Sequence, residues 1–241
     1  MIIKFLKIYF TLFIFLFSYS NAQNTSTLVV EGYRGNLKIE GYAGDTIAVS
    51  VNPKDTPFAI DKQDKISYFR SASVQMSEYH ILVPYQTYLK IRWTDEGNID
   101  IKKIKSGIEL QSRKGKITLT EIKGWAFVQI DDGDIEADFA EVTPQKPISF
   151  TNITGNITLN IPEKTNAFLQ MQNQENVVEN DFETNINAKN ESAGSMTNNG
   201  NADVRTKKYQ LPKLKEKEMG SSENIFKINS RKGKIKIKKR F

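Results

Sequence analysis

A short acidic run near residue 133 holds the side chains of this sequence that are best suited to chemistry. Asp132 and Asp134 flank Gly133, and Glu136 follows two positions later. Carboxylates grouped in this way could bind Ca²⁺, which takes six to eight oxygen ligands, and with Lys116 they could act on an acidic polysaccharide. Acidic side chains at every second position also describe the solvent-facing side of a β-strand, which needs no ligand. The sequence lacks the glycine-rich nonapeptide of calcium-binding β-rolls, so we assign no metal, no cofactor and no catalytic residue.

Histidine, cysteine and aromatic residues narrow the choice further. The sequence has one histidine, His80, and no cysteine, which excludes zinc sites built from several such residues and any disulfide framework. Aromatic side chains are better candidates, because an exposed ring can stack on the face of a sugar. We expect Trp93 to pack in the interior, and we select Trp125 and Asp134 as candidate surface-binding residues. The other aromatic candidates are Tyr33, Tyr42 and Tyr88.

These side chains are set on a repeat of paired apolar residues that recurs every nine positions in three stretches, with a slip near residue 144 and a long break before residue 226. Alternation at period two puts both members of a pair on one face of a strand. Glycine stands two places before many of the pairs, which is typical of a turn because glycine adopts positive φ without a steric penalty. The pairs are Ile99/Ile101, Ile108/Leu110, Ile117/Leu119, Ala126/Val128, Ile135/Ala137, Ile148/Phe150, Ile157/Leu159, Phe226/Ile228 and Ile235/Ile237.

A second period, of eighteen residues, joins Ile104, Ile122 and Ala140, and it also separates Gly115 from Gly133. An antiparallel meander and a coiled solenoid could both use a nine-residue unit, but the longer period favours a solenoid. Stacked rungs bury the apolar face that a single rung leaves exposed. The predicted fold is all-β: a single-chain β-solenoid, or β-helix-like stack of short strands, with about nine residues per strand-plus-turn and two strands per rung.

One β-repeat domain is predicted over residues 23–241. Residues 53–79 show little periodicity, and we predict an irregular segment there that caps one end of the stack, because exposed rung edges recruit other chains. The regular ladder is predicted over 88–171 and the closing strands over 224–239. Residues 173–219 are rich in asparagine and poor in large apolar residues, which is typical of a disordered insertion.

Residues 1–22 are predicted as a signal peptide. Two lysines precede an apolar stretch, and Ser20 and Ala22 place small residues at −3 and −1 of the cleavage site. Cleavage would make Gln23 the first residue and lower the formal net charge from +6 to +4, because the leader carries two lysines and no acid. We expect no transmembrane segment in the mature chain, since the apolar stretch is shorter than the roughly 20 residues of a bilayer span. The predicted location is the periplasm, the cell surface or the extracellular space, where nucleic acid is not an expected partner.

The order and spacing of these motifs resemble those of the putative-adhesin family of bacterial β-strand-repeat proteins of unknown function, in a secreted, Bacteroidetes-type form. The resemblance covers most of residues 27–239. It is carried by the run from His80 to Phe139, by the segment Gly155–Pro162 and by the closing Gly233–Ile237. It implies a β-helix-like protein of the cell envelope or surface, and it lends no catalytic residues.

We therefore expect an adhesin or structural surface protein without catalytic activity, whose partner is a glycan, matrix or another envelope protein. Two alternatives stay open. One is a solenoid polysaccharide lyase or hydrolase that uses Asp132, Asp134 and Lys116, and the other is a periplasmic accessory in envelope signalling. The sequence does not predict the oligomeric state.

Overall fold

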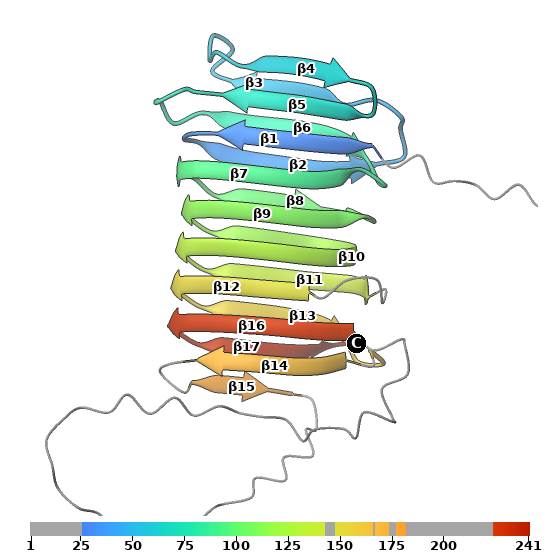
Figure 1. Cartoon of the computed structure of the whole chain (residues 1–241), viewed down its shortest axis with the longest axis vertical. Coiled ribbons are helices and arrows are strands. Elements are labelled where there is room, and N and C mark those ends of the chain that lie inside the picture. The colour runs from blue at the N-terminus through green and yellow to red at the C-terminus, as the bar shows by residue number, and fades with distance from the viewer. Residues whose placement is uncertain (1–25, 143–147, 166, 174–176, 182–223) are drawn as a thin grey trace, which may run out of the picture.

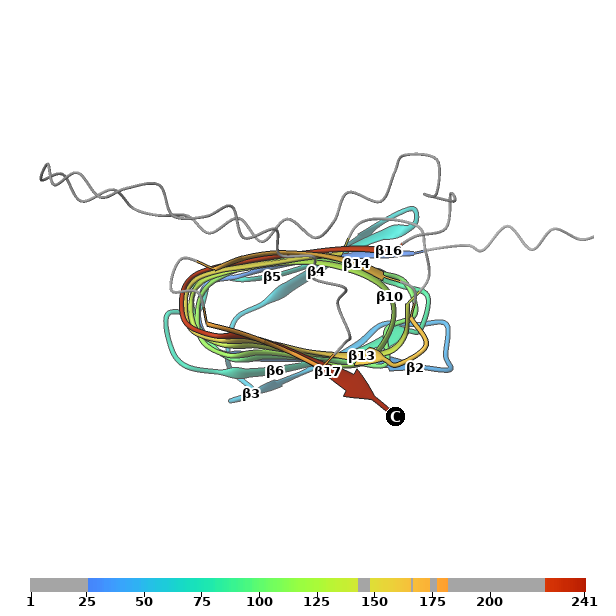
Figure 2. The same ribbon diagram turned by 90° about the horizontal axis from the view of Figure 1, so that it is seen from below.

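The computed structural model describes residues 26–142, 148–165, 167–173, 177–181 and 224–241, which form a stack of short β-strands (Figure 1). These residues contain no helix, and so none that could cross a membrane. Two sheets, here called sheet A and sheet B, face each other across an apolar core, as the view along the stack shows (Figure 2). In stack order, sheet A consists of β4 (Ala59–Gln63), β5 (Ile66–Ser71), β1 (Thr27–Gly32), β7 (Tyr88–Glu96), β9 (Gly107–Lys114), the second half of β10 (Ile117–Asp132), β12 (Ile148–Thr154), β16 (Asn224–Lys232) and β14 (Ala167–Asn173). Sheet B consists of β3 (Ala48–Asn52), β6 (Glu78–Pro84), β2 (Asn36–Tyr42), β8 (Ile99–Lys102), the first half of β10, β11 (Ile135–Val142), β13 (Ile157–Pro162), β17 (Ile235–Arg240) and β15 (Val178–Asn180).

The predicted solenoid with two strands per rung is confirmed. Each rung has one strand in each sheet, and neighbouring rungs of the central ladder pair in parallel with equivalent residues eighteen apart: Ile108 aligns with Ala126 in sheet A, and Ile117 with Ile135 in sheet B. Every residue of the predicted apolar pairs is at most 1% exposed. Burying a large aliphatic side chain contributes about 1.5–3 kcal/mol, so these ladders are the main source of stability.

The eighteen-residue period that joins Ile122 to Ala140 does not continue into the buried positions of β11. The pairing of β10 with β11 shifts register twice, and this shift aligns Phe139 with Ile122. Phe139 is fully buried as a result, whereas Ala140, which the eighteen-residue period selects, is half-buried. The Phe139 ring packs edge-on against Phe150 and Phe226 in the rungs that follow.

Glycines stack at the corner where each rung passes from sheet A to sheet B. At Gly133 φ is +147°, and a Cβ atom there would lie 1.7 Å from the carbonyl oxygen of Gly115. The neighbouring polar side chains bond to the next rung: Asn98 Oδ1 accepts a hydrogen bond from the backbone N–H of Lys116 at 2.9 Å. This close stacking explains why glycine followed by a polar residue recurs through the sequence.

The rungs are not stacked in chain order at either end. Strands β1 and β2 lie between the β5–β6 rung and the β7–β8 rung. At the other end, β16 and β17 lie between the β12–β13 rung and the β14–β15 rung. Figure 1 shows this order as blue β1 between β5 and β7, and red β16 between β12 and β14. The first and last described strands are therefore hydrogen-bonded on both edges, and internal segments form the outermost rungs.

The segment 53–79 is more regular than its sequence indicates, which corrects the prediction of an irregular segment. It contains β4 and β5, which pair antiparallel, and β3 pairs antiparallel with β6. All five residues of β4 are exposed, so the strand has no buried face and therefore no alternating pattern. Strands β3 and β4 lie at one end of the stack, as expected of a cap.

The predicted insertion over 173–219 also begins with regular structure, because β15 lies within it and pairs with β17. The rest of that segment from residue 182 onward, and the predicted signal peptide over 1–22, lie outside the described residues.

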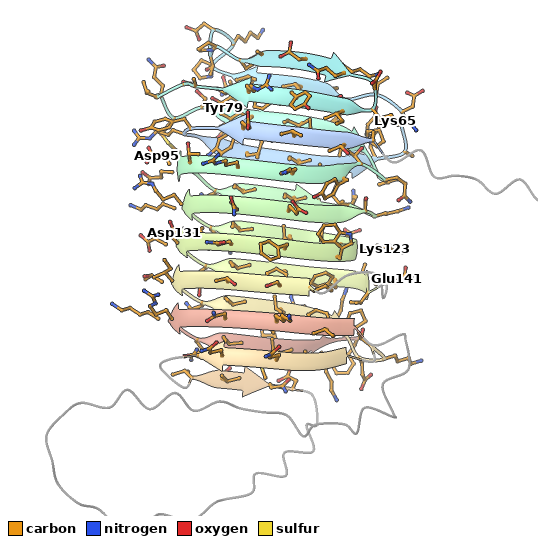
Figure 3. All side chains as sticks on the ribbon, in the orientation of Figure 1. Lys65, Tyr79, Asp95, Lys123, Asp131 and Glu141 are labelled. Carbon is orange, nitrogen blue, oxygen red and sulfur yellow. The ribbon has the colours of Figure 1, made fainter. Side chains whose placement is uncertain are left out.

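A buried carboxylate joins three successive rungs of sheet A at one edge of the stack (Figure 3). Asp95 lies in β7 with its side chain 5% exposed, and its Oδ2 atom is 2.6 Å from Arg34 Nη2. Arg113, which belongs to β9, donates to the other carboxylate oxygen. The guanidinium groups of Arg113 and Arg34 hold the pKa of Asp95 below its usual value. An ionised Asp95 therefore ties the inserted β1 rung to the regular ladder.

Candidate ligand-binding face

The two sheets present different outer faces. On sheet B, lysines and arginines pair with carboxylates across the strands: Lys116 Nζ lies 2.9 Å from Glu136 Oε2, and Arg240 Nε lies 3.4 Å from Asp138 Oδ1. On sheet A, a column of amide and hydroxyl side chains follows the stack, and these groups both donate and accept hydrogen bonds. The column consists of Gln111, Gln129, Thr151, Asn229 and Gln172. This column of sheet A is therefore suited to an uncharged polar ligand.

Three aromatic side chains lie beside this column on sheet A. Trp125 is aligned with Gly107 in the neighbouring rung, and a Cβ atom at Gly107 would lie 2.2 Å from Trp125 Cε2. The indole therefore lies against the backbone of that rung. It reaches Tyr88, with ring centroids 5.6 Å apart and planes at 34°. Phe127, two residues farther along β10, is 43% exposed. We call Tyr88, Trp125 and Phe127 the aromatic patch.

Tyr88 stays neutral within this patch. Partial burial, then the hydrogen bond to Glu109 and the charge of that carboxylate, raise the pKa of the Tyr88 hydroxyl. Because an un-ionised tyrosine keeps its proton as a donor, the bond to Glu109 also orients the ring that contacts Trp125. The three rings of the patch are therefore uncharged, and the Glu109 carboxylate, which is aligned with Phe127, borders them.

The structure does not bring Trp125 and Asp134 into one site. Trp125 begins the half of β10 that lies in sheet A. That half ends at Asp132, about 23 Å away at 3.3 Å per residue, and Asp134 lies beyond this end. Figure 3 shows the nearby Lys123 and Asp131 at opposite edges of the stack. Asp134 Oδ1 accepts hydrogen bonds from the backbone N–H and the side-chain amide of Asn156. Its carboxylate thus holds a corner between rungs and lines a separate depression of about 280 Å³.

The acidic run crosses the corner between the two sheets. Glu136 pairs with Lys116 on sheet B, whereas Asp132 ends the sheet A half of β10, where it is exposed and aligned with Lys114 of the neighbouring strand. Within the described residues, no three His, Cys, Asp or Glu side chains are grouped so that they could hold a metal ion. We therefore derive no metal-dependent step from Asp132 and Asp134.

The remaining aromatic candidates are scattered. Trp93 is 1% exposed, which confirms that it packs in the core, where its ring meets Tyr79 edge-on. The Tyr42 hydroxyl bonds to Thr46, away from the patch. Phe127 was missed in the sequence analysis, although its signal is present: it lies between the buried Ala126 and Val128, so alternation alone places it outside.

The fold and this face define the class of protein. It is a two-sheet parallel β-solenoid of stacked repeats, whose outer surface is extended and rigid. The chain belongs to the Toastrack family, DUF4097, whose family model matches residues 23–238.

Two solved structures are similar to this chain. One is a putative cell adhesion protein from Clostridium sporogenes, at 13% identity and a TM-score of 0.46, covering 90% of this chain and 93% of that one. The other is a putative adhesin from Bacteroides fragilis, at 10% identity and a TM-score of 0.29, also covering 90% of this chain and 93% of that one. No curated protein matches the sequence.

Proposed function

We propose that this protein is an exported adhesin of the cell envelope or surface, without catalytic activity, that binds a surface glycan through the outer face of sheet A. Matrix or another envelope protein is the alternative partner. The export part of the proposal rests on the leader-like pattern of residues 1–22.

The observation that carries the binding proposal is the aromatic patch beside a column of amides and hydroxyls. A sugar ring has apolar C–H faces and a rim of hydroxyl groups, so it can stack on Trp125 or Phe127 while its hydroxyls bond to Gln111 or Gln129. The strands that carry these side chains are spaced about 4.8 Å apart. A rigid sheet holds such contacts in place before the ligand arrives, which lowers the entropy cost of binding.

Binding to a glycan array tests this proposal. Trp125→Ala should weaken binding by about five- to thirtyfold, because loss of one stacked ring removes roughly 1–2 kcal/mol. The matched control is Phe241→Ala, which removes an aromatic ring that is 99% exposed and outside the patch; it should bind like the wild type. Equal binding by Trp125→Ala and wild type, with both folded by circular dichroism, would contradict the assignment of the patch.

The non-catalytic part has its own test. The purified protein is incubated with acidic polysaccharides, with and without Ca²⁺, and product release is followed by chromatography. We expect no products. Cleavage that is lost in Asp132→Asn or Asp134→Asn would instead support the polysaccharide-degrading alternative.

A further inference from the structure

A second depression lies higher on sheet A, in the rungs formed by β5, β1 and β7. It is a shallow, open hollow of about 630 Å³ with a mostly apolar lining. This volume is within the range of small-molecule sites, about 300–1,000 Å³. The side chains that matter for its chemistry are those of Tyr33, Phe58, Arg70, Arg92 and Glu31.

Two partly exposed aromatic rings line this depression. Tyr33 is 41% exposed and Phe58 is 42% exposed. The Phe58 ring stacks on the buried Phe69, with centroids 5.8 Å apart and planes at 26°, which fixes the ring while leaving part of it open. Exposed apolar side chains grouped in a hollow mark an interaction site more often than single ones do.

The lining of the depression carries two cations, Arg70 and Arg92, and one anion, Glu31; Asp61 lies outside the lining. Arg70, Glu31 and Arg92 follow one another across three neighbouring strands on the outer face. Glu31 pairs with Arg70 at 3.1 Å, and Asp61 adds a second carboxylate to Arg70 at 3.0 Å. On its other side, Arg92 is aligned with the neutral Gln111. Among the described residues, no ion pair involves Arg92.

We propose that this depression binds a uronic acid unit of an acidic polysaccharide. The Arg92 guanidinium donates two parallel hydrogen bonds to the sugar carboxylate, the geometry that makes arginine the preferred partner of carboxylates. Tyr33 and Phe58 contact the C–H face of the pyranose ring. Arg70 is already neutralised by two carboxylates and holds the rim of the site.

The balance of apolar surface and charge favours a sugar over an acidic peptide. The rings of Tyr33 and Phe58 lie in the same depression as one unpaired cation, Arg92. This combination suits a ligand that carries one carboxylate on a sugar ring with a broad C–H face. An aspartate or glutamate side chain offers only one or two methylene groups for the same rings. The depression does not include any residue of the aromatic patch, so this inference does not depend on glycan binding there.

Calorimetric titration with a purified oligogalacturonate tests the site, with the carboxyl-reduced form of the same oligosaccharide as the uncharged comparison. The wild type should bind the acidic form, and Arg92→Gln should weaken that binding about ten- to a hundredfold, the equivalent of one lost charge-assisted pair. Tyr33→Ala should weaken it as well. The matched control is Lys90→Gln, which removes an exposed cation from the same outer face of β7 outside the depression; its affinity should stay within about twofold of the wild type, as expected for a screened surface charge.

Each contrary outcome overturns the proposal. Equal losses in Arg92→Gln and Lys90→Gln would mean unspecific charge attraction, and equal binding of the reduced oligosaccharide would mean that no carboxylate is read. Tighter binding of a glutamate-rich peptide would make this an acidic-peptide site, and no binding of the oligogalacturonate would leave no uronate site. Arg92→Gln should leave binding to neutral glycans intact and Trp125→Ala should leave oligogalacturonate binding intact, so failure of either proposal can be told from failure of the other.

Discussion

Gly133 has no room for a side chain, and replacing it with alanine should destabilise the whole stack. The new Cβ atom would lie 1.7 Å from the Gly115 carbonyl oxygen, where ordinary contact begins at 3.4 Å. The obstacle is backbone, so it cannot rotate away, and the φ of +147° is one that residues with side chains rarely adopt. The neighbouring rung must therefore move.

The magnitude follows from two losses. Holding alanine in a backbone conformation of this kind costs about 1–3 kcal/mol. Moving the corner also weakens the hydrogen bond from Gly133 N to Thr154 O, which is 2.8 Å long, and a backbone hydrogen bond contributes about 1 kcal/mol. A combined loss of about 3 kcal/mol lowers Tm by about 6–12 °C in a protein of this size.

Thermal unfolding followed by circular dichroism measures this change. The matched control is Gly44→Ala, where the new Cβ atom would meet the ring of Tyr42 at 2.0 Å and φ is not positive. A partly exposed side chain can rotate, and the rotation gives up only the exposed hydrogen bond from the Tyr42 hydroxyl to Thr46 O, so this variant should stay within about 1 kcal/mol of the wild type. If Gly133→Ala and Gly44→Ala had the same Tm, the close backbone contact at Gly133 would not limit stability, and the reasoning would be refuted.

Three further predictions concern charge, the core and the patch. The folded state lowers the pKa of Asp95. Its contribution to the free energy of unfolding is therefore fully present above the pKa of the unfolded chain, about 3.9, and is lost as the pH falls through the lowered, folded-state pKa. Asp95→Asn should thus have a lower Tm than the wild type at pH 7, and the difference in Tm should shrink as the pH falls. A difference in Tm that does not depend on pH would contradict this role. Phe139→Ala should cost about 3–5 kcal/mol in urea unfolding because its ring is fully buried, whereas the half-exposed Phe127→Ala should cost under about 1 kcal/mol; similar losses would argue against the register shift. Glu109→Gln should lower the pKa of Tyr88 in an alkaline spectrophotometric titration, since the carboxylate is one cause of the raised value; an unchanged titration would rule out their contact.

In the regular ladder, alternation along the sequence is enough to predict which side of a strand is buried. Alternation and the nine-residue step are local properties of the chain, and they place pairs such as Ile108 and Leu110 in the core without reference to distant residues. The corner glycines are readable for the same reason, because positive φ favours glycine, although Asp64, Lys103 and Glu121 adopt it as well. The outward position of Phe127 was equally available from the pattern.

The order in which the rungs stack is visible only in the tertiary structure. All the rungs present similar edges, so a local repeat cannot specify that β1 pairs with β5 and β7 or that β16 lies between β12 and β14. The bridge from Asp95 to Arg34 and Arg113 depends on that insertion, because Arg34 reaches β7 only from an inserted β1. The same long-range pairing lines up Arg70, Glu31 and Arg92, and the length of a strand separates Trp125 from Asp134. Strand pairings between distant segments determine which side chains share a surface. The energies of those pairings cannot be predicted from any short stretch of the chain.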